Sequence, residues 1–359
     1  MAVHVGENIS FFMGPKMEGT SLSGLDDLEE VIVDFIDAAE DRLEIAVQEL
    51  ESLQITEAIL RARIERGVKV AIVLEADYLK AQRRPDTVED AFDPSGGHEV
   101  NRALAAAILR ANIWARTDYN PAIFHQKFII RDREAVLTGS TNFTPTGVGK
   151  SPLGGNLNHV LTVNSKDLAR IYYREFREIR QGKFGKNVGD RNEQPDVVTL
   201  DGVEMKVCFA PDHNPELEIV KRINKARERI DFAIFTFAES SGIDDAVKLA
   251  MLAGVKVRGA MDGMQANQKW AASKHLVGDE AELFRVFPKK GFINKLHHKL
   301  LTVDDKEMVI GSFNYTGPAN KTNDENIIVL SGEGAKPMVE AARAEIDRII
   351  DDHGVPLTS

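Results

Sequence analysis

Two periodicities of apolar residues alternate along the chain, and the whole alternation occurs twice. Helical spacing, with apolar positions three or four residues apart, marks residues 28–39 and 217–223 and is expected again at 166–180 and 335–351. Short continuous apolar runs predict buried strands at 45–47 and 68–74 in the first half and at 232–235 and 255–261 in the second. Strands that alternate with helices predict an α/β fold in which helices cover mixed sheets.

The two halves also resemble each other in sequence. The segment RLEIAVQEL (42–50) aligns with RIDFAIFTF (229–237). This separation is far longer than the period of a solenoid repeat, so a duplication of one α/β unit is the simplest explanation. The predicted lobes are residues 1–190 and 191–359, joined by a polar, glycine-containing segment.

Composition narrows the class of protein. Of the 359 residues, 43% are hydrophobic, which is enough for a sizeable core. The single cysteine, Cys208, cannot form an internal disulfide, and neither a membrane-spanning stretch nor an export signal is recognisable, so we expect a cytoplasmic protein without a transmembrane segment. The net charge of −11 disfavours a protein that coats nucleic acid, although a local basic cleft is compatible with an acidic body.

One group of polar residues occurs in both halves with the same spacing. FHQKFIIRD (124–132) precedes TGSTNFT (138–144), and LHHKLLTVD (296–304) precedes IGSFNYT (310–316). Side chains two positions apart share a strand face, so a hairpin would place each His/Lys pair beside a Ser/Asn pair. The predicted patches are His125, Lys127, Ser140 and Asn142 in the first half and His297, Lys299, Ser312 and Asn314 in the second. Asp132 and Asp304 lie near the turns and are interpreted as structural residues that accept backbone amides.

Two such patches facing each other across a pseudo-two-fold axis would suit a phosphodiester. Two ammonium groups and several neutral donors would stabilise the phosphate oxygens, whose negative charge increases in the transition state. One histidine would attack phosphorus as a neutral imidazole, and the other would protonate the leaving oxygen and then activate water. This chemistry requires no metal ion and no cofactor.

A non-catalytic interpretation would suit a single copy of the His-x-Lys motif better than it suits two copies. One His-x-Lys on a strand is typical of a surface pair, whereas two copies with the same downstream Gly-Ser-x-Asn favour catalysis. Zinc binding is disfavoured because His297 and His298 are adjacent and point to opposite faces, and because the chain has one cysteine. The histidines outside the motif are expected to be surface or core residues: His98, His159, His213, His275 and His353.

The duplicated H-x-K-x4-D followed by Gly-Ser-x-Asn resembles the hallmark of the phospholipase D superfamily, and both copies fit without substitution. The resemblance implies two pseudo-symmetric α/β/α sandwich lobes with mixed sheets, a phosphohistidine intermediate and no metal cofactor. Residues 297–330 are most similar to the nuclease-type and cardiolipin hydrolase-like branch. In that branch the Glu of an N-x-E-N element orients the catalytic histidine, and Glu325 matches it.

The first lobe departs from this pattern at one position. Its segment NLNHVLTV (156–163) places Asn158 where the second lobe has Glu325. A carboxylate stabilises an imidazolium more strongly than an amide does. We therefore expect a neutral His125 beside Asn158 and a proton-holding His297 beside Glu325. This agrees with the family default, in which the N-terminal histidine is the nucleophile.

The substrate class depends on weaker signals. Three segments mix cations with aromatic residues and are expected at the mouth of a cleft, where they suit single-stranded nucleic acid or an anionic membrane surface. The candidate substrate-binding residues are Arg83, Arg84, Lys269, Trp270, Lys289, Lys290 and Lys295. An additional first-lobe segment, 86–107, is expected to form a lid or a surface loop.

These signals favour a nuclease that cleaves single-stranded DNA or RNA. The alternative is a lipid phosphodiesterase or phosphatidyltransferase that resembles phospholipase D or cardiolipin synthase. A third interpretation, which the complete motif disfavours, is a non-catalytic phosphate-binding scaffold. One chain holds both motif copies, so a monomer is chemically sufficient.

Overall fold

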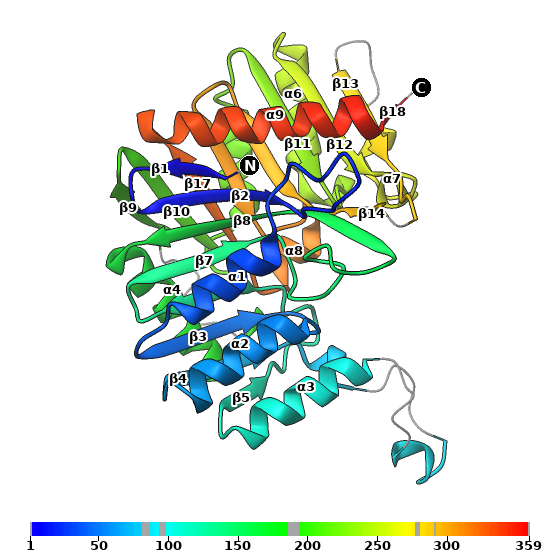
Figure 1. Ribbon diagram of the computed structural model, residues 1–359. Coiled ribbons are helices and arrows are strands. Elements are labelled where there is room, and N and C mark those ends of the chain that lie inside the picture. Colours follow the sequence, from blue (N-terminus) through cyan, green and yellow to red (C-terminus); the bar gives the residue numbers. More distant parts are fainter. Residues whose placement is uncertain are drawn as a thin grey trace.

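The computed structural model describes residues 2–80, 86–92, 98–185, 194–276, 281–290 and 292–357 and shows two α/β lobes with mixed sheets (Figure 1). The predicted fold class is thereby confirmed. The boundary expected between residues 190 and 191 lies outside the described residues. Within the described part, no helix combines the length and apolar character needed to cross a bilayer.

The sheet of the N-terminal lobe combines parallel and antiparallel neighbours. Strands β3, β4 and β5 are parallel, and the remaining pairs on this path are antiparallel. In spatial order the strands are β1 (Val3–Val5), β2 (Ile9–Gly14), β8 (Gly154–Asn164), β7 (Ala135–Gly139), β6 (Lys127–Arg131), β3 (Arg42–Val47), β4 (Lys69–Leu74) and β5 (Trp114–Thr117).

The sheet of the C-terminal lobe repeats this topology and adds one edge strand. In the corresponding order its strands are β9 (Asp196–Leu200), β10 (Val203–Ala210), β17 (Glu325–Ser331), β16 (Glu307–Gly311), β15 (Lys299–Val303), β11 (Arg229–Ile234), β12 (Lys256–Asp262), β13 (Ala281–Val286) and β18 (Gly354–Pro356). The repeat inferred from the sequence is therefore a repeat of strand order.

Helices cover both faces of each sheet, and their apolar stripes explain which face each one buries. The helices of the N-terminal lobe are α1 (Leu28–Asp37), α2 (Leu53–Ile64), α3 (Glu99–Arg110) and α4 (Lys166–Arg180). Those of the C-terminal lobe are α5 (Pro215–Ile223), α6 (Ile243–Leu252), α7 (Gly263–Ala266), α8 (Gly317–Lys321) and α9 (Lys336–His353). In α4, Leu168, Tyr172 and Phe176 recur at helical spacing and are fully buried.

One hydrophobic core is shared by the two lobes. Helix α4 packs on β6 and β7 of its own sheet and also contacts β9, while α9 packs on β11, β12, β15 and β16 and also contacts β1. Phe128 and Tyr172 from the first lobe belong to the same buried cluster as Met308 and Met338 from the second. The ring of Tyr172 meets that of Phe209 across the junction, with centroids 5.3 Å apart. The lobes are thus packed through their interiors.

A strand of the second lobe extends the sheet of the first. Strand β14 (Phe292–Leu296) runs parallel to the start of β8 and pairs Leu296 with Leu157. Gly154 lies at this contact with φ +115°, and a Cβ there would meet the backbone of Phe292 at 3.1 Å. The close approach of the two backbones therefore requires glycine at this position.

The expectation for residues 86–107 is wrong over residues 99–107, which belong to helix α3. Ile108 is fully buried, and the helix packs on α2 and β5. Asn101 donates to Glu51 Oε1 at 2.6 Å. This stretch is therefore part of the outer helical layer. Residues 93–97 lie outside the described residues.

Candidate active site

The two motif histidines lie where strands of one lobe meet the other lobe. His125 lies two residues before the start of β6 at Lys127, and His297 lies two residues before the start of β15 at Lys299. The backbone N–H of His125 donates to Asp324 O at 2.9 Å, and that of His297 donates to Leu157 O at 3.0 Å. Each histidine is therefore attached to the opposite lobe through its own backbone.

The imidazole side chains are held in the same crossed manner. His125 Nδ1 lies 2.6 Å from Glu325 Oε2, and His297 Nδ1 lies 2.9 Å from Asn158 Oδ1. The pairing expected from the sequence, Asn158 with His125 and Glu325 with His297, is wrong. Strands β8 and β17 pass through the junction at these residues, so their side chains reach the histidine of the opposite lobe.

The motif serines fix the two residues that orient the histidines. Ser140 Oγ donates to Asn158 Oδ1 at 2.8 Å, and Ser312 Oγ donates to Glu325 Oε2 at 2.6 Å. Both serines are fully buried. The expectation that these hydroxyls lie beside the lysines as donors for an anion is therefore corrected: they act behind the histidines.

These contacts determine which ring nitrogen is available for chemistry. The amide of Asn158 donates from Nδ2 to Gly147 O at 3.0 Å and Asn156 O at 3.1 Å, which directs its Oδ1 toward His297. Both Asn158 Oδ1 and the Glu325 carboxylate accept hydrogen bonds, so each histidine donates from Nδ1–H. In both rings Nε2 is the nitrogen left for a substrate.

The motif lysines are buried beside their histidines. Lys127 Nζ donates to His125 O at 2.9 Å and to Gln48 Oε1 at 3.2 Å, and Lys299 Nζ donates to His297 O at 2.8 Å. Each ammonium has three N–H groups, so these bonds leave donor capacity for an anion.

Burial makes the charged forms of these groups costly in the absence of an anion. It lowers the pKa of His125 to about 4, against the opposing effect of Glu325, and lowers the pKa of Lys127 to about 7. The pKa values of His297 and Lys299 also lie well below their usual ranges, because burial is reinforced by Lys299 and Lys127 respectively. The negative charge of a bound phosphodiester would favour the protonated forms of the two lysines.

Two carboxylates beside Lys127 were missed by sequence reasoning. Glu49 and Glu75 both raise the pKa of Lys127, and Glu49 Oε2 accepts from Asn142 Nδ2. Glu49 comes two residues after the end of β3, and Glu75 directly follows the parallel strand β4. Polar residues at the carboxyl ends of parallel strands commonly line sites, and this signal was available in the sequence.

The motif asparagines differ in their surroundings but share one feature. Asn142 is tied to Glu49, whereas the residue that aligns with Glu49 in the second lobe is Thr236. The Oδ1 atoms of Asn142 and Asn314 are both buried and have no hydrogen-bond partner among the described residues.

The motif aspartates tie each motif hairpin to the neighbouring strand of its sheet. Asp132 accepts the backbone N–H groups of Glu40, Asp41 and Arg42 at 2.7–3.0 Å. Asp304 accepts those of Arg227, Glu228 and Arg229 at 2.8–3.2 Å. Both aspartates are in the left-handed backbone region at the turns of the motif hairpins. They tie the β6–β7 and β15–β16 hairpins to the starts of β3 and β11.

The candidate substrate-binding residues lie in different places. Lys295 is near the lysine pair. Its Nζ lies 5.5 Å from the ring centre of Phe235, and Lys299 Nζ lies 5.1 Å from the same ring centre. Its charge also lowers the pKa of His297. Trp270 is 40% exposed in a segment that pairs with Ala238, just beyond β11. Lys269, Lys289 and Lys290 are exposed. Arg83 and Arg84 lie outside the described residues.

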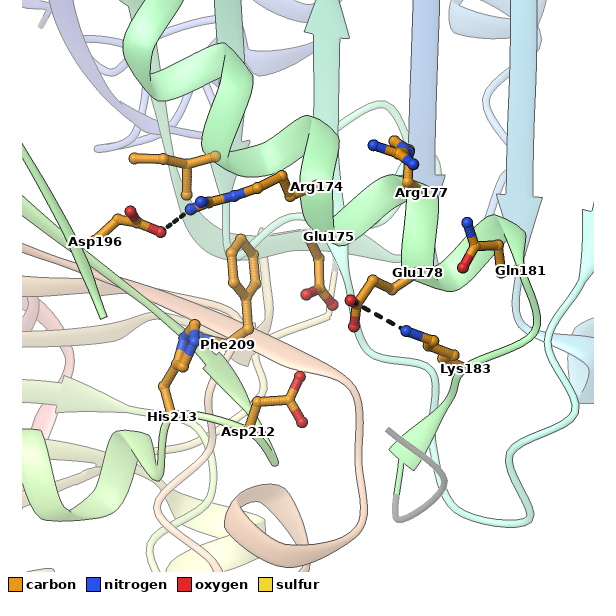
Figure 2. A pocket seen from close by; sticks show the side chains of 11 residues that line it. Arg174, Glu175, Arg177, Glu178, Gln181, Lys183, Asp196, Phe209, Asp212 and His213 are labelled. Carbon is orange, nitrogen blue, oxygen red and sulfur yellow. Dashed lines mark hydrogen bonds and ion pairs between the residues drawn. The ribbon is translucent and has the colours of Figure 1, made fainter. Parts of the chain in front are cut away.

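A separate cavity of about 280 Å³ lies between α4 and the end of β10, and no motif residue lines it (Figure 2). Figure 2 shows Arg174 paired with Asp196, and Lys183 paired with Glu178 at 3.3 Å. The charged side chains that line this cavity thus include two ion pairs at the lobe junction. Among the described residues, the cavity included, no group of three or more His, Cys, Asp or Glu side chains is arranged to hold a metal ion.

Comparison with known proteins agrees with this geometry. Residues 32–180 and 219–350 match the family model described as "Cardiolipin synthase, PLD-like domain". The chain is 30% identical over 130 residues to phospholipase D of Rickettsia conorii, an alignment that covers 36% of this chain and 62% of that protein. It is 26% identical over 115 residues to the human mitochondrial cardiolipin hydrolase, covering 32% and 36%. The chain therefore spans less than two thirds of the length of these relatives.

Solved structures show the same fold over the whole chain. A phosphatidylserine synthase from Haemophilus influenzae superposes with a TM-score of 0.67 and 12% identity, covering 99% of this chain and 88% of the other. A polyphosphate kinase from Porphyromonas gingivalis gives 0.64 and 12%, covering 99% and 50%. The two matched regions, the repeated strand order and the paired His-Lys motifs together show that this chain belongs to the phospholipase D superfamily, in the family of cardiolipin synthase-type domains.

Proposed function

We propose that this protein transfers a phosphoryl group from a phosphodiester through a phosphohistidine on His125. The observation that carries the proposal is the crossed pairing of the histidines, which anchors Nδ1 of each ring and so makes Nε2 the nitrogen that would react. His125 is the nucleophile because its anchor, Glu325, is a carboxylate. A carboxylate stabilises the positive charge that the ring acquires when Nε2 bonds to phosphorus.

His297 acts as the general acid and then as the general base. Its anchor, Asn158, is neutral and stabilises an imidazolium less, so a protonated His297 gives up its proton to the leaving oxygen more readily. The P–O bond to the leaving group breaks as the bond to His125 forms. His297, now neutral, removes a proton from water, which attacks phosphorus and releases His125. This assignment of roles matches the family default, but the reason is the reverse of the one expected from the sequence.

The lysines bind the non-bridging oxygens. Lys127 and Lys299 each keep donor capacity, and the charge of Lys127 lowers the pKa of Lys299. An anion between them offsets this repulsion and also accepts their hydrogen bonds.

For the substrate we propose a phospholipid-type diester, in place of the nucleic acid favoured by the sequence. Glu49 and Asp262 lie close enough to influence the lysine pair and, when ionised, would repel the neighbouring phosphates of an extended polyanion. Burial raises the pKa of Glu75 to about 7, so its charge adds to this repulsion mainly above neutral pH. A lipid presents one phosphodiester, and Phe235 adds an apolar surface beside His297, with ring centres 5.0 Å apart. The curated relatives named phospholipase D and cardiolipin hydrolase support the same class.

Single-stranded nucleic acid is the second candidate. Lys295 beside Phe235, together with the half-exposed Trp270, offers the combination of cation and aromatic ring that binds a base and its phosphate.

The test offers the purified chain vesicles of phosphatidylglycerol or cardiolipin, labelled single-stranded DNA and RNA, each with a chelator present. We expect release of a lipid product that is lost in His125→Asn. Cleavage of nucleic acid alone would overturn the lipid assignment, and Glu49→Gln would then be expected to raise that cleavage. Turnover that survives in both His125→Asn and His297→Asn would overturn the histidine mechanism itself.

A further inference from the structure

Two buried polar pairs lie beneath the catalytic histidines, at positions related by the pseudo-two-fold axis. The residues that follow His125 and Glu325 form one pair, in which Asn326 Nδ2 donates to Gln126 Oε1 at 2.7 Å. The residues that follow His297 and Asn158 form the other, in which His298 Nδ1 lies 3.1 Å from His159 Nδ1. All four side chains are fully buried. The axis thus places an amide pair at one position and a histidine pair at the other.

The contacts of the histidine pair fix its protons. The backbone N–H of Gly311 donates to His159 Nε2 at 3.3 Å, so this nitrogen carries a lone pair and His159 is protonated on Nδ1. His159 Nδ1–H then donates to His298 Nδ1, which leaves the proton of His298 on Nε2. That atom faces Glu345 Oε1 at 3.7 Å. The chain of hydrogen bonds therefore runs from Gly311 through His159 to His298, whose Nε2 has no hydrogen-bond partner among the described residues.

A further proton has no place in this chain that preserves all of its bonds. If it enters His159, it occupies Nε2 and opposes the N–H of Gly311. If it enters His298, it occupies Nδ1, and His159 must move its own proton to Nε2 to remain an acceptor. Either way the N–H of Gly311 loses its acceptor inside the protein, which is costly for a buried backbone group.

Gly311 connects this event to the catalytic site. It directly precedes Ser312, whose hydroxyl holds Glu325, which in turn holds His125. A Cβ at Gly311 would lie 2.2 Å from Asn326 O, so the turn has little room to move.

We propose that the His159–His298 pair is a positioning device that holds the Gly311–Ser312 turn, and through it His125, only while both rings are neutral. Its catalytic consequence rests on the phosphodiesterase function proposed above, whereas its effect on stability does not. The inference assigns a role to two histidines that lie outside the duplicated motif.

The charged groups around the pair are few among the described residues. Glu345 and Arg348 approach from α9 and bond each other at 2.7 Å, and Lys299 lies on β15. From β2, Met13 pairs with His159 in the sheet, and the apolar ring of Phe11 lies 6.1 Å from the ring of His159. Burial lowers the pKa of both histidines; Glu345 opposes this for His298, and Lys299 reinforces it for both. The neutral pair is therefore the form present at neutral pH.

The sharpest test copies the amide pair into the histidine position, as the double variant His159→Asn, His298→Gln. In the wild type the unfolded chain binds protons on these histidines below a pH of about 6.5 while the folded chain does not, so stability falls as the pH decreases. The free energy of unfolding is measured in urea from pH 8 to pH 5. We expect the double variant to take up about two fewer protons on unfolding at the acidic end. His275→Gln, which removes a histidine with a half-exposed side chain, is the matched control.

Three readouts separate the outcomes. Equal proton uptake by the wild type and the double variant would overturn the proposal. Nitrogen NMR of the wild type at neutral pH tests it without any variant: we expect the proton on Nδ1 in His159 and on Nε2 in His298, and a proton on Nε2 of His159 would overturn it. In the activity profile, the double variant should retain turnover and extend it to lower pH. If the wild type hydrolyses no diester at any pH, the proposed function fails while the first two readouts still decide this inference.

Discussion

At the scale of single residues, the site is asymmetric although the motif is duplicated. Both histidines donate from Nδ1, both serines hold the acceptor, and both lysines bond the histidine carbonyl. The difference is one acceptor, Glu325 on one side and Asn158 on the other. In our account this single substitution decides which ring forms the covalent bond.

Exchange of charge between the two acceptors tests that assignment. Glu325→Gln keeps an acceptor for His125 Nδ1 but removes the charge, and we expect kcat to fall by roughly 10²–10⁴-fold. Asn158→Asp is the matched variant; it makes His297 a weaker acid, and we expect a loss of about tenfold with an optimum at higher pH. Steady-state rates against pH measure both. A larger loss in Asn158→Asp than in Glu325→Gln would contradict the assignment.

The lysine pair predicts a pH dependence of anion binding. Burial lowers the pKa of Lys127 to about 7, so above that pH the free protein loses protons that an anion needs. Sulfate keeps its charge across this range and is a suitable probe. We expect its affinity to fall by about tenfold per pH unit between pH 7.5 and 9.5, with at least one proton taken up on binding. Calorimetry in buffers of different ionisation enthalpy measures that uptake; an affinity independent of pH would refute the prediction.

At the scale of elements, the periodicity of apolar residues predicted most of the fold. The stripes at 28–39 and 166–180 correspond to α1 and α4, and the apolar run at 68–74 corresponds to β4. Local patterns of this kind depend only on which face of an element is buried. They placed the motif lysines on strands and the aspartates at turns for the same reason, whereas the histidines lie two residues before those strands.

The sequence could not reveal which elements of different lobes meet. The partners of His125 and His297 were exchanged because the register between β8, β14 and β17 is set by the packing of the lobes and has no local signal. Helix α3 was missed because its stretch from Glu99 was judged by the preceding acidic and glycine residues. The histidine pair was invisible because His159 and His298 are 139 residues apart.

The motif aspartates provide a prediction for the hairpins. Asp304→Ala removes the acceptor of three backbone N–H groups, and we expect the free energy of unfolding to fall by about 3 kcal/mol. The adjacent Asp305→Ala removes an exposed ion pair with Arg343, and we expect a change below about 1 kcal/mol. Urea unfolding compares the free energies of unfolding of the two variants. Equal losses would show that the backbone contacts of Asp304 add no more stability than an exposed ion pair does.

At the scale of the whole molecule, each lobe completes the site of the other. The backbone and Nδ1 of each histidine are bonded to the opposite lobe, β14 joins the opposite sheet, and α4 and α9 contribute to one shared core. Each half has a hydrophobic cluster of its own, and a third cluster is shared by both halves. This mutual completion explains why both copies of the motif keep all of their residues.

The shared interior predicts a single unfolding transition. Scanning calorimetry should show one peak whose calorimetric and van't Hoff enthalpies agree. Two resolved transitions, with one assigned to each lobe, would contradict the shared core.

The central claim is that His125 and His297 act on one phosphorus atom with His125 as the nucleophile. The most direct measurement uses His297→Asn with a p-nitrophenyl phosphodiester, whose leaving group departs without a proton. We predict a burst of p-nitrophenolate approaching one per protein molecule, and mass spectrometry that places the phosphoryl adduct on His125. The account would be contradicted if the reciprocal variant His125→Asn carried the adduct on His297 while His297→Asn carried none on His125.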